Sequence, residues 1–160
     1  MKKTFLVTAL IFCFTLISSQ TKTFRGTWFE IKHPSTFIPK VSLKSPSVEN
    51  GCESALFESQ DKLVEFYVFS PQWMGNPTDI ALKDTEKISS NKTKTSGNKT
   101  IKWWTIIAKD GSYTRSYEET KDNLSNTNSV VGIKYKNLAA YKKYKTEYLA
   151  FKSSLTQFAD

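Results

Sequence analysis

The residues that could do chemistry are few in this sequence and lie far apart. His33 is the only histidine, and it stands directly before Pro34. Of the two cysteines, Cys13 lies in an apolar N-terminal run, which leaves Cys52 as the candidate nucleophile. A cysteine nucleophile needs a nearby base, and His33 is remote from it in the sequence. We therefore interpret Cys52 as a small, half-buried residue of a turn.

Motifs for catalysis and for metal or cofactor binding are absent from the sequence. One histidine and one cysteine cannot supply a zinc site, and the acidic residues show no calcium-loop spacing. Glu118 and Glu119 are adjacent and so point to opposite faces of a strand, which makes them a poor acid–base pair. Glu53, Glu58 and Asp61 flank a predicted hairpin, where exposed carboxylates are expected. The sequence predicts no cofactor and favours a protein that is not an enzyme, although folding can bring scattered carboxylates together.

The N-terminus predicts export. Two lysines follow the first methionine, residues 5–17 form an apolar run, and the next residues are small or polar. A cut after Ser19 satisfies the small-residue rule for signal peptides, and the run is short for a membrane span, which needs about 20 residues. We predict a signal peptide over 1–19 and a single domain over 20–160, periplasmic or secreted and without a transmembrane segment. An uncleaved membrane anchor is the alternative.

Lysines and tryptophans gather in one stretch of the chain, which carries a formal net charge of +8. The candidate ligand-binding residues there are Lys92, Lys94, Lys99 and Lys102, beside Trp103 and Trp104. Basic, aromatic strands are typical of single-stranded nucleic-acid binding. The other interpretation is a soluble, lysine-rich edge strand whose tryptophans lie in the core. Because export removes the chain from nucleic acids, we expect no nucleic-acid partner. The alternative contacts for this patch are an anionic surface polymer and lipid headgroups.

Trp73 is a further candidate for ligand contact. It lies in the loop 71–77, which is bounded by two prolines. A large ring in a loop can stack on a sugar or a peptide. The alternative, which we favour, is a ring folded back onto the sheet.

The remaining pattern predicts an α+β domain with a mostly antiparallel sheet of about six to seven strands. Asp110-Gly111 is a strong hairpin signal between 99–108 and 112–119. The first run is apolar on both faces and predicts a central strand, whereas the second has one polar face and should lie nearer an edge. The lysine-rich run 86–95 is predicted to be an exposed edge strand, with a disordered loop as the alternative.

A second hairpin and a long C-terminal helix complete the expected core. Residues 54–58 and 63–70 predict the hairpin, and its second strand is aromatic and β-branched on both faces, with Glu65 as its only charge. The helix should begin after Asn137, an N-cap residue. Apolar side chains recur there at steps of three and four, which is typical of a helix that packs on a sheet. They are Leu138, Tyr141, Tyr144, Tyr148, Phe151, Leu155 and Phe158.

Several stretches resemble the PsbP-like family. WFEIKHPSTF resembles its first strand, and SALFESQDKLVEFYVFSPQW looks like its next hairpin. IKWWTIIAKDGSYTRSYEE and the closing helix with FKSSL are similar to its later meander and C-terminal helix. The resemblance implies an α/β/α sandwich, and it implies an accessory or binding protein, as for extrinsic photosystem subunits and Ran-binding import factors. It supplies no catalytic motif, and a shared fold does not identify a ligand.

The leading prediction is an exported, non-catalytic binding or accessory protein of the cell envelope, with an unknown envelope or extracellular partner. Two alternatives stay open. A hydrolase or transferase acting on cell-surface polymer needs two or more carboxylates that converge in a pocket. A carrier of an apolar ligand needs a cavity between the sheet and the C-terminal helix.

Overall fold

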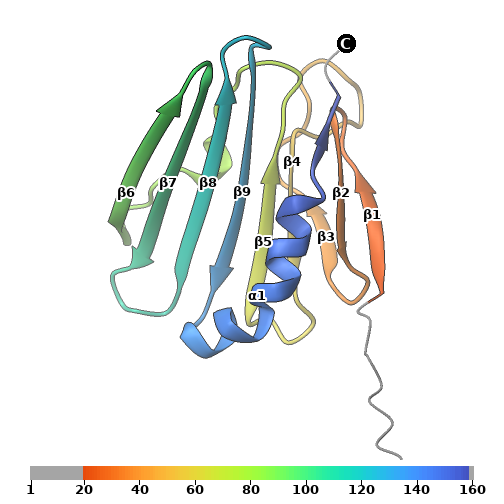
Figure 1. The fold of residues 1–160 in the computed structure, drawn as a ribbon. Helices are drawn as coiled ribbons and strands as arrows, with labels where there is room; N and C mark the ends of the chain where they lie inside the picture. The colour runs from red at the N-terminus through yellow and green to blue at the C-terminus, as the bar shows by residue number, and fades with distance from the viewer. Residues whose placement is uncertain (1–19, 159–160) are drawn as a thin grey trace, which may run out of the picture.

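The chain folds into two antiparallel β-sheets and one α-helix, in a computed structural model that describes residues 20–158 (Figure 1). The predicted signal peptide over 1–19 lies outside the described residues. The large sheet has seven strands in the order β3-β4-β5-β9-β8-β7-β6, and the small sheet has three in the order β1-β2-β10. This arrangement confirms the predicted α+β class.

The elements have the following bounds. The strands of the large sheet are β3 (Ile38–Val41), β4 (Ser54–Glu58), β5 (Val64–Phe69), β6 (Glu86–Ser96), β7 (Lys99–Ala108), β8 (Thr114–Asp122) and β9 (Thr127–Tyr135). Those of the small sheet are β1 (Thr21–Arg25), β2 (Phe29–Pro34) and β10 (Thr156–Gln157). The helix α1 spans Leu138–Ser153, and a short 3-10 helix, η1, spans Thr78–Ile80. Within residues 20–158, no helix has both the length and the apolar character that a membrane span requires.

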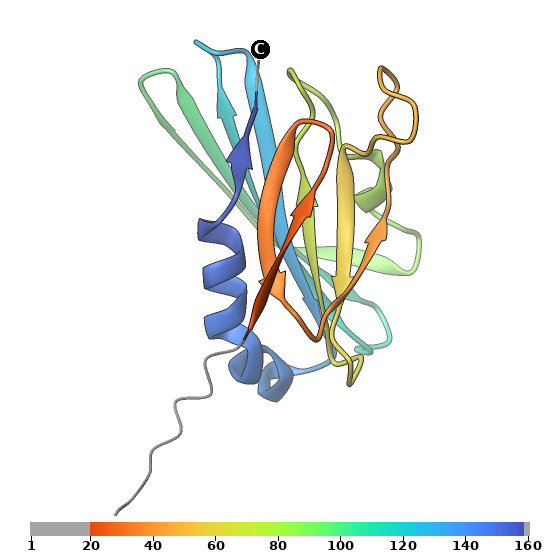
Figure 2. The ribbon, with the colours of Figure 1, turned by 90° about the vertical axis from the view of Figure 1, so that its right-hand side faces the viewer.

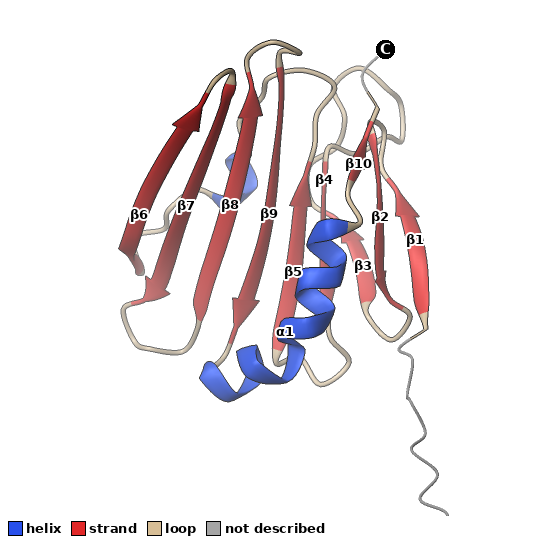
Figure 3. Ribbon diagram, in the orientation of Figure 1, coloured by secondary structure: helices blue, strands red, loops and turns tan. Residues whose placement is uncertain are grey.

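The large sheet separates two hydrophobic clusters. On the face that we call the helix side, α1 and β2 pack against β4, β5 and β9. On the opposite face, the η1 side, Ile80 packs with Tyr67, Phe69 and Tyr117. Figure 2 shows α1 and η1 on opposite sides of the sheet. The helix side is covered only in part. No helix lies in front of β6, β7 and β8 (Figure 3).

The helix packs on the sheet through aromatic rings. Phe151 is buried, and its ring centroid lies 5.2 Å from those of both Phe57 and Phe66. The ring of Tyr148 lies 5.4 Å from that of Phe66. Rings at these distances are in contact. These contacts fill the interface between α1 and the large sheet, where the carrier of an apolar ligand would need a cavity. A pocket of about 310 Å³ lies instead between α1 and β2, and Phe151 is one of its lining residues.

The helix α1 begins as predicted and ends earlier. The side-chain oxygen of Asn137 accepts a hydrogen bond from the Ala140 N–H at 2.9 Å, which is the expected N-cap. The helix ends at Ser153, and Phe158 lies beyond β10. Leu138 is 60% exposed. The first and last members of the predicted stripe therefore lie off the packed face: Leu138 is exposed in the first turn, and the chain has left the helix to pair with β2 before Phe158.

The strand order corrects the predicted places of two strands. The Asp110-Gly111 hairpin is confirmed and joins β7 to β8. However, β7 lies second from the edge and is half-buried at Trp103 and Trp104, whereas β8 lies between β7 and β9. The prediction of a central β7 and a more peripheral β8 is therefore wrong. The alternating polar residues of β8 face the part of the helix side that no helix covers. Their polarity therefore reflects exposure of this face of the sheet, and not a position at its edge.

Two other strand predictions are confirmed. Residues 86–95 form most of β6, an edge strand of the large sheet that is exposed along its length after Glu86. The disordered-loop alternative for this segment is wrong. The strand β5 lies between β4 and β9, as expected for a strand that is apolar on both faces.

Gly132 allows an aromatic ring to lie directly on β9. A Cβ atom at this position would stand 2.2 Å from Cδ1 of Tyr117, whose buried ring stacks on Trp104. We expect Gly132→Ala to lower the free energy of unfolding by about 1–3 kcal/mol, because the ring must shift in a packed cluster. Urea unfolding measures this. Ser129→Ala on the same strand is the control and should change little, and equal stability of both variants would contradict the packing described.

Candidate functional site

The structure brings three of the four predicted lysines to one face. Residues paired directly across antiparallel strands point to the same face. Lys92 is paired with Trp103 and Lys94 with Ile101, while Lys99 precedes Ile101 by two positions on β7. These five residues lie on the helix side of β6 and β7, where no helix covers the sheet (Figure 3). We call them the basic face.

The other two predicted site residues lie elsewhere. Lys102 points to the η1 side, and its Nζ atom lies 5.3 Å from the ring centroid of Trp104. It therefore does not join the basic face. Trp73 lies in the loop after β5 and is 43% exposed, so its ring is only partly folded back.

A hydrogen bond and an ion pair orient the tryptophan of the basic face. Trp103 Nε1 donates to Glu118 Oε2 at 2.6 Å. Lys152 of α1 forms an ion pair with the same carboxylate. Charge-assisted hydrogen bonds are stronger than neutral ones. The ring of Trp103 is therefore held in place next to α1 and remains half-exposed.

The basic face has few acidic partners among the described residues. Lys99 lies 3.8 Å from the carboxylate of Asp122, and both groups are partly exposed. No carboxylate lies within 4.0 Å of the ammonium groups of Lys92 and Lys94 in residues 20–158. This half of the sheet therefore presents positive charge, whose effect reaches roughly 8 Å at physiological salt.

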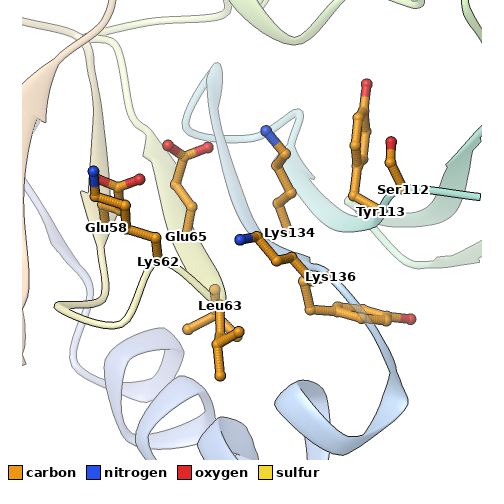
Figure 4. A pocket seen from close by; sticks show the side chains of 10 residues that line it. Glu58, Lys62, Leu63, Glu65, Ser112, Tyr113, Lys134 and Lys136 are labelled. Atoms are coloured by element: carbon orange, nitrogen blue, oxygen red, sulfur yellow. The ribbon is translucent and has the colours of Figure 1, made fainter.

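A separate pocket of about 370 Å³ lies at one end of the large sheet (Figure 4). The hairpin between β4 and β5, the turn between β7 and β8, and the end of β9 line it. Its residues are Glu58, Lys62, Leu63, Val64, Glu65, Ser112, Tyr113, Lys134, Tyr135 and Lys136. Pockets that bind small molecules have volumes of about 300–1,000 Å³.

Two carboxylates face each other in this pocket. Glu58 on β4 and Glu65 on β5 are directly paired, and like charges in this arrangement are destabilising. Neither carboxylate has a hydrogen bond or an ion pair from another described residue. Burial raises the pKa of Glu65; Lys134 opposes the rise and Glu58 adds to it. This pair was not predicted from the sequence. Glu65 was its one visible indication, because it is the single charged residue in an otherwise apolar strand.

Lysines surround the two carboxylates. Lys134 on β9 is the cross-strand neighbour of Glu65, and its Nζ atom lies 4.6 Å from the ring centroid of Tyr113. Figure 4 shows Glu65 and Lys134 pointing to the same side of the sheet. Lys62 and Lys136 also line the pocket and are exposed. The pocket therefore holds both signs of charge on adjacent walls.

A buried ion pair lies behind the pocket and was not predicted from the sequence. The side chains of Arg115 on β8 and Glu86 on β6 are 6% and 0% exposed. Arg115 also donates to the backbone oxygens of Ile80 and Ala81 at 2.8 and 2.9 Å. It thereby fixes η1 to the sheet, and we call this set the Arg115–Glu86 network.

The Arg115–Glu86 network is structural. The hydroxyl of Tyr113 donates to Glu86 Oε1 at 2.6 Å, and the Lys83 N–H donates to Oε2 at 2.9 Å. Burial alone would raise the pKa of Glu86, but the hydrogen bonds from Arg115 and Tyr113 outweigh it and lower the pKa to about 2. A carboxylate with both oxygens occupied is a poor general base. The network is connected to the pocket by Tyr113, which lines the pocket and donates a hydrogen bond to Glu86.

The candidate nucleophile and base do not form a reactive pair. Burial raises the pKa of the Cys52 thiol and lowers the pKa of His33. The ring of His33 packs 4.9 Å from that of Phe57, and its Nδ1 lies 2.9 Å from the Pro34 oxygen. Over residues 20–158, no group of three or more histidine, cysteine or acidic side chains is placed to hold a metal ion.

Comparisons with known proteins identify the fold. No protein-family model matches the chain, and no curated protein matches its sequence. The solution structure of cyanobacterial PsbP (CyanoP) from Synechocystis sp. PCC 6803 is similar to it, with a TM-score of 0.53 and 7% identity, over 91% of this chain and 97% of that chain. The Ran-binding protein Mog1p of Saccharomyces cerevisiae gives a TM-score of 0.46 and 10% identity, over 89% and 97% of the two chains. The likeness to CyanoP confirms that this chain has a PsbP-like fold.

Proposed function

We propose that the chain is an exported, non-catalytic accessory protein of the cell envelope that binds an anionic surface polysaccharide through the basic face. The mature domain would span 20–160 after removal of 1–19. The observation that carries the proposal is the convergence of Lys92, Lys94 and Lys99 beside Trp103 on the uncovered half of the sheet.

The geometry of the basic face suits an extended anionic chain. Side chains two positions apart on a strand point to the same face and lie about 7 Å apart. Lys92 and Lys94 therefore form a row along the edge strand, with the ring of Trp103 beside them. Aromatic rings supply apolar contact for a sugar ring, and the row of ammonium groups supplies attraction to carboxylates or phosphates.

The binding test uses polygalacturonate, a polymer with one carboxylate on each sugar. Replacing Lys92, Lys94 and Lys99 together by glutamine should weaken binding about tenfold or more, and should reduce its dependence on salt. The matched control replaces three exposed lysines elsewhere, at positions 22, 32 and 142. Equal losses in both triple variants would show that only net charge matters and would contradict the proposed site.

Export is tested separately. Expression of the full chain with its own N-terminus in a bacterium should give a protein in the periplasm or medium whose N-terminal residue is Gln20, as shown by mass spectrometry. A protein that keeps residues 1–19 and stays with the membrane would support the uncleaved anchor.

One observation favours a second candidate function, a hydrolase or transferase acting on cell-surface polymer. The directly paired Glu58 and Glu65 lie in a pocket, which is the feature that this alternative requires. Cross-strand partners have Cβ atoms about 4.5–5.5 Å apart, which allows their carboxyl groups to act on one substrate. Release of product by the wild-type protein, lost in Glu65→Gln, would establish this function in place of the first.

A further inference from the structure

The pocket at the end of the large sheet contains two neighbouring carboxylates, Glu58 and Glu65, that form no hydrogen bond or ion pair with the described residues, although Lys134 lies next to Glu65. Glu58 and Glu65 repel each other across β4 and β5 without a hydrogen bond from any described residue. A partly buried titratable group beside a second charge in a pocket is typical of a functional site. An ammonium group placed between the two carboxylates would remove the repulsion and supply hydrogen-bond donors to both.

The adjacent wall of the pocket, formed by β9, carries the complementary charge. Lys134 lies next to Glu65 on β9, and the ring of Tyr113 fixes the position of its ammonium group. Tyr113 is in turn held by its hydrogen bond to Glu86. The cation–π contact of Lys134 and the hydrogen bond of Tyr113 favour this position of the ammonium group before a ligand binds. Lys136, which also lines the pocket, adds a second cation.

We propose that this pocket binds a small zwitterion that carries an ammonium group and a carboxylate, such as an amino acid or a short peptide with free ends. The ammonium group contacts Glu58 and Glu65, and the carboxylate contacts Lys134 and Lys136. A volume of about 370 Å³ accommodates a molecule of this size, and Leu63 and Tyr135 give it an apolar wall. The site lies on other elements than the basic face, so the proposal does not depend on the proposed function.

The ligand chemistry is tested with three probes that differ only at their ends. They are alanylalanine, its N-acetyl derivative without the ammonium group, and its amide without the carboxylate. Titration of the ¹⁵N-labelled mature protein should shift the amide signals of β5 and β9 near the pocket. Because each end makes charge-assisted contacts, we expect both blocked probes to bind about tenfold or more weakly than alanylalanine.

Two variants assign the ends of the ligand to the two walls. Glu65→Gln should weaken binding of alanylalanine and of the amide, without a further effect on the N-acetyl probe. Lys134→Gln should weaken binding of alanylalanine and of the N-acetyl probe, without a further effect on the amide. Glu49→Gln and Lys142→Gln change exposed residues outside the pocket and should leave all three affinities unchanged.

Several results would overturn the proposal. Equal binding of all three probes, or no shift at saturating alanylalanine, would show that the charged walls do not recognise a zwitterion. Tightest binding of the N-acetyl probe would show a plain anion site. None of these results bears on binding of polygalacturonate by the basic face, so the two proposals fail separately.

Discussion

Arg115→Met should lower the free energy of unfolding by about 3–5 kcal/mol, because it leaves the carboxylate of Glu86 buried without its partner. The side chain of Glu86 is 0% exposed, so water cannot replace the lost contacts. The substitution also removes the donors to Ile80 and Ala81 that hold η1 on the sheet. Urea unfolding measures the loss of stability, and hydrogen exchange over residues 78–81 should show local opening.

The matched control is Arg25→Met. Arg25 and Glu30 also form an ion pair, but the side chain of Arg25 is 75% exposed. Exposed pairs contribute about 0–1 kcal/mol. A similar loss in both variants would contradict the buried character of the Arg115–Glu86 network. A second check is Glu86→Gln in the Arg115→Met background, which should recover part of the stability because no buried charge remains.

The Arg115–Glu86 network makes the free energy of unfolding depend on pH in the acidic range. The pKa of Glu86 falls from 4.5 to about 2 on folding, so the unfolded chain binds the proton more tightly. Stability from this group is complete above pH 4.5 and is lost as the pH falls toward 2. Glu86→Gln should flatten the stability profile in this window. Burial raises the pKa of Asp61, but hydrogen bonds from Lys143, Ser59 and Tyr144 outweigh burial and lower it. The stability of the Glu86→Gln variant should therefore still fall somewhat as the pH decreases.

Phe151→Ala should lower the free energy of unfolding by about 3–5 kcal/mol, as for other large aromatic residues truncated in a core. Phe151 is 1% exposed and contacts Phe57 and Phe66, so its loss leaves a cavity between α1 and the sheet. Thermal and urea unfolding measure the effect.

The same helix offers the control for this prediction. Leu149 lies two positions earlier and is 50% exposed, so Leu149→Ala should change stability by no more than about 0.5 kcal/mol. If both substitutions cost the same, the packed face of α1 would differ from the one described, and the aromatic interface would not hold the helix on the sheet.

The local patterns of the sequence predicted most of the elements. Asp110-Gly111 and the alternating runs around it predicted β7 and β8, and the aromatic run over 63–70 predicted β5. Asn137 predicted the start of α1. These signals depend on neighbouring residues alone, because side chains alternate along a strand and recur every three to four residues in a helix. The polar segment 21–25 lacks such a pattern, so β1 was not predicted.

The sequence could not predict which strands are neighbours in the sheet. The order of the strands determines which side chains come together in the candidate sites. A strand with one polar face, such as β8, can lie inside the sheet because α1 covers only part of the sheet. The part that α1 covers is decided by the packing of the whole chain. The same packing placed Lys99 with Lys92 and Lys94, and turned Lys102 to the other face.

The sequence by itself determined the composition of the core, the two main hairpins, the helix start and the scarcity of nucleophiles and metal ligands, since each follows from residue types and short spacings. Only the tertiary structure decided that Glu58 lies opposite Glu65 and that Arg115 reaches Glu86, two pairs separated by 7 and 29 positions. The register of the β4–β5 hairpin depends on the geometry of its turn, and the contact between Arg115 and Glu86 depends on the order of β6, β7 and β8 in the sheet. For this reason the pocket and the buried ion pair became visible only in the folded chain.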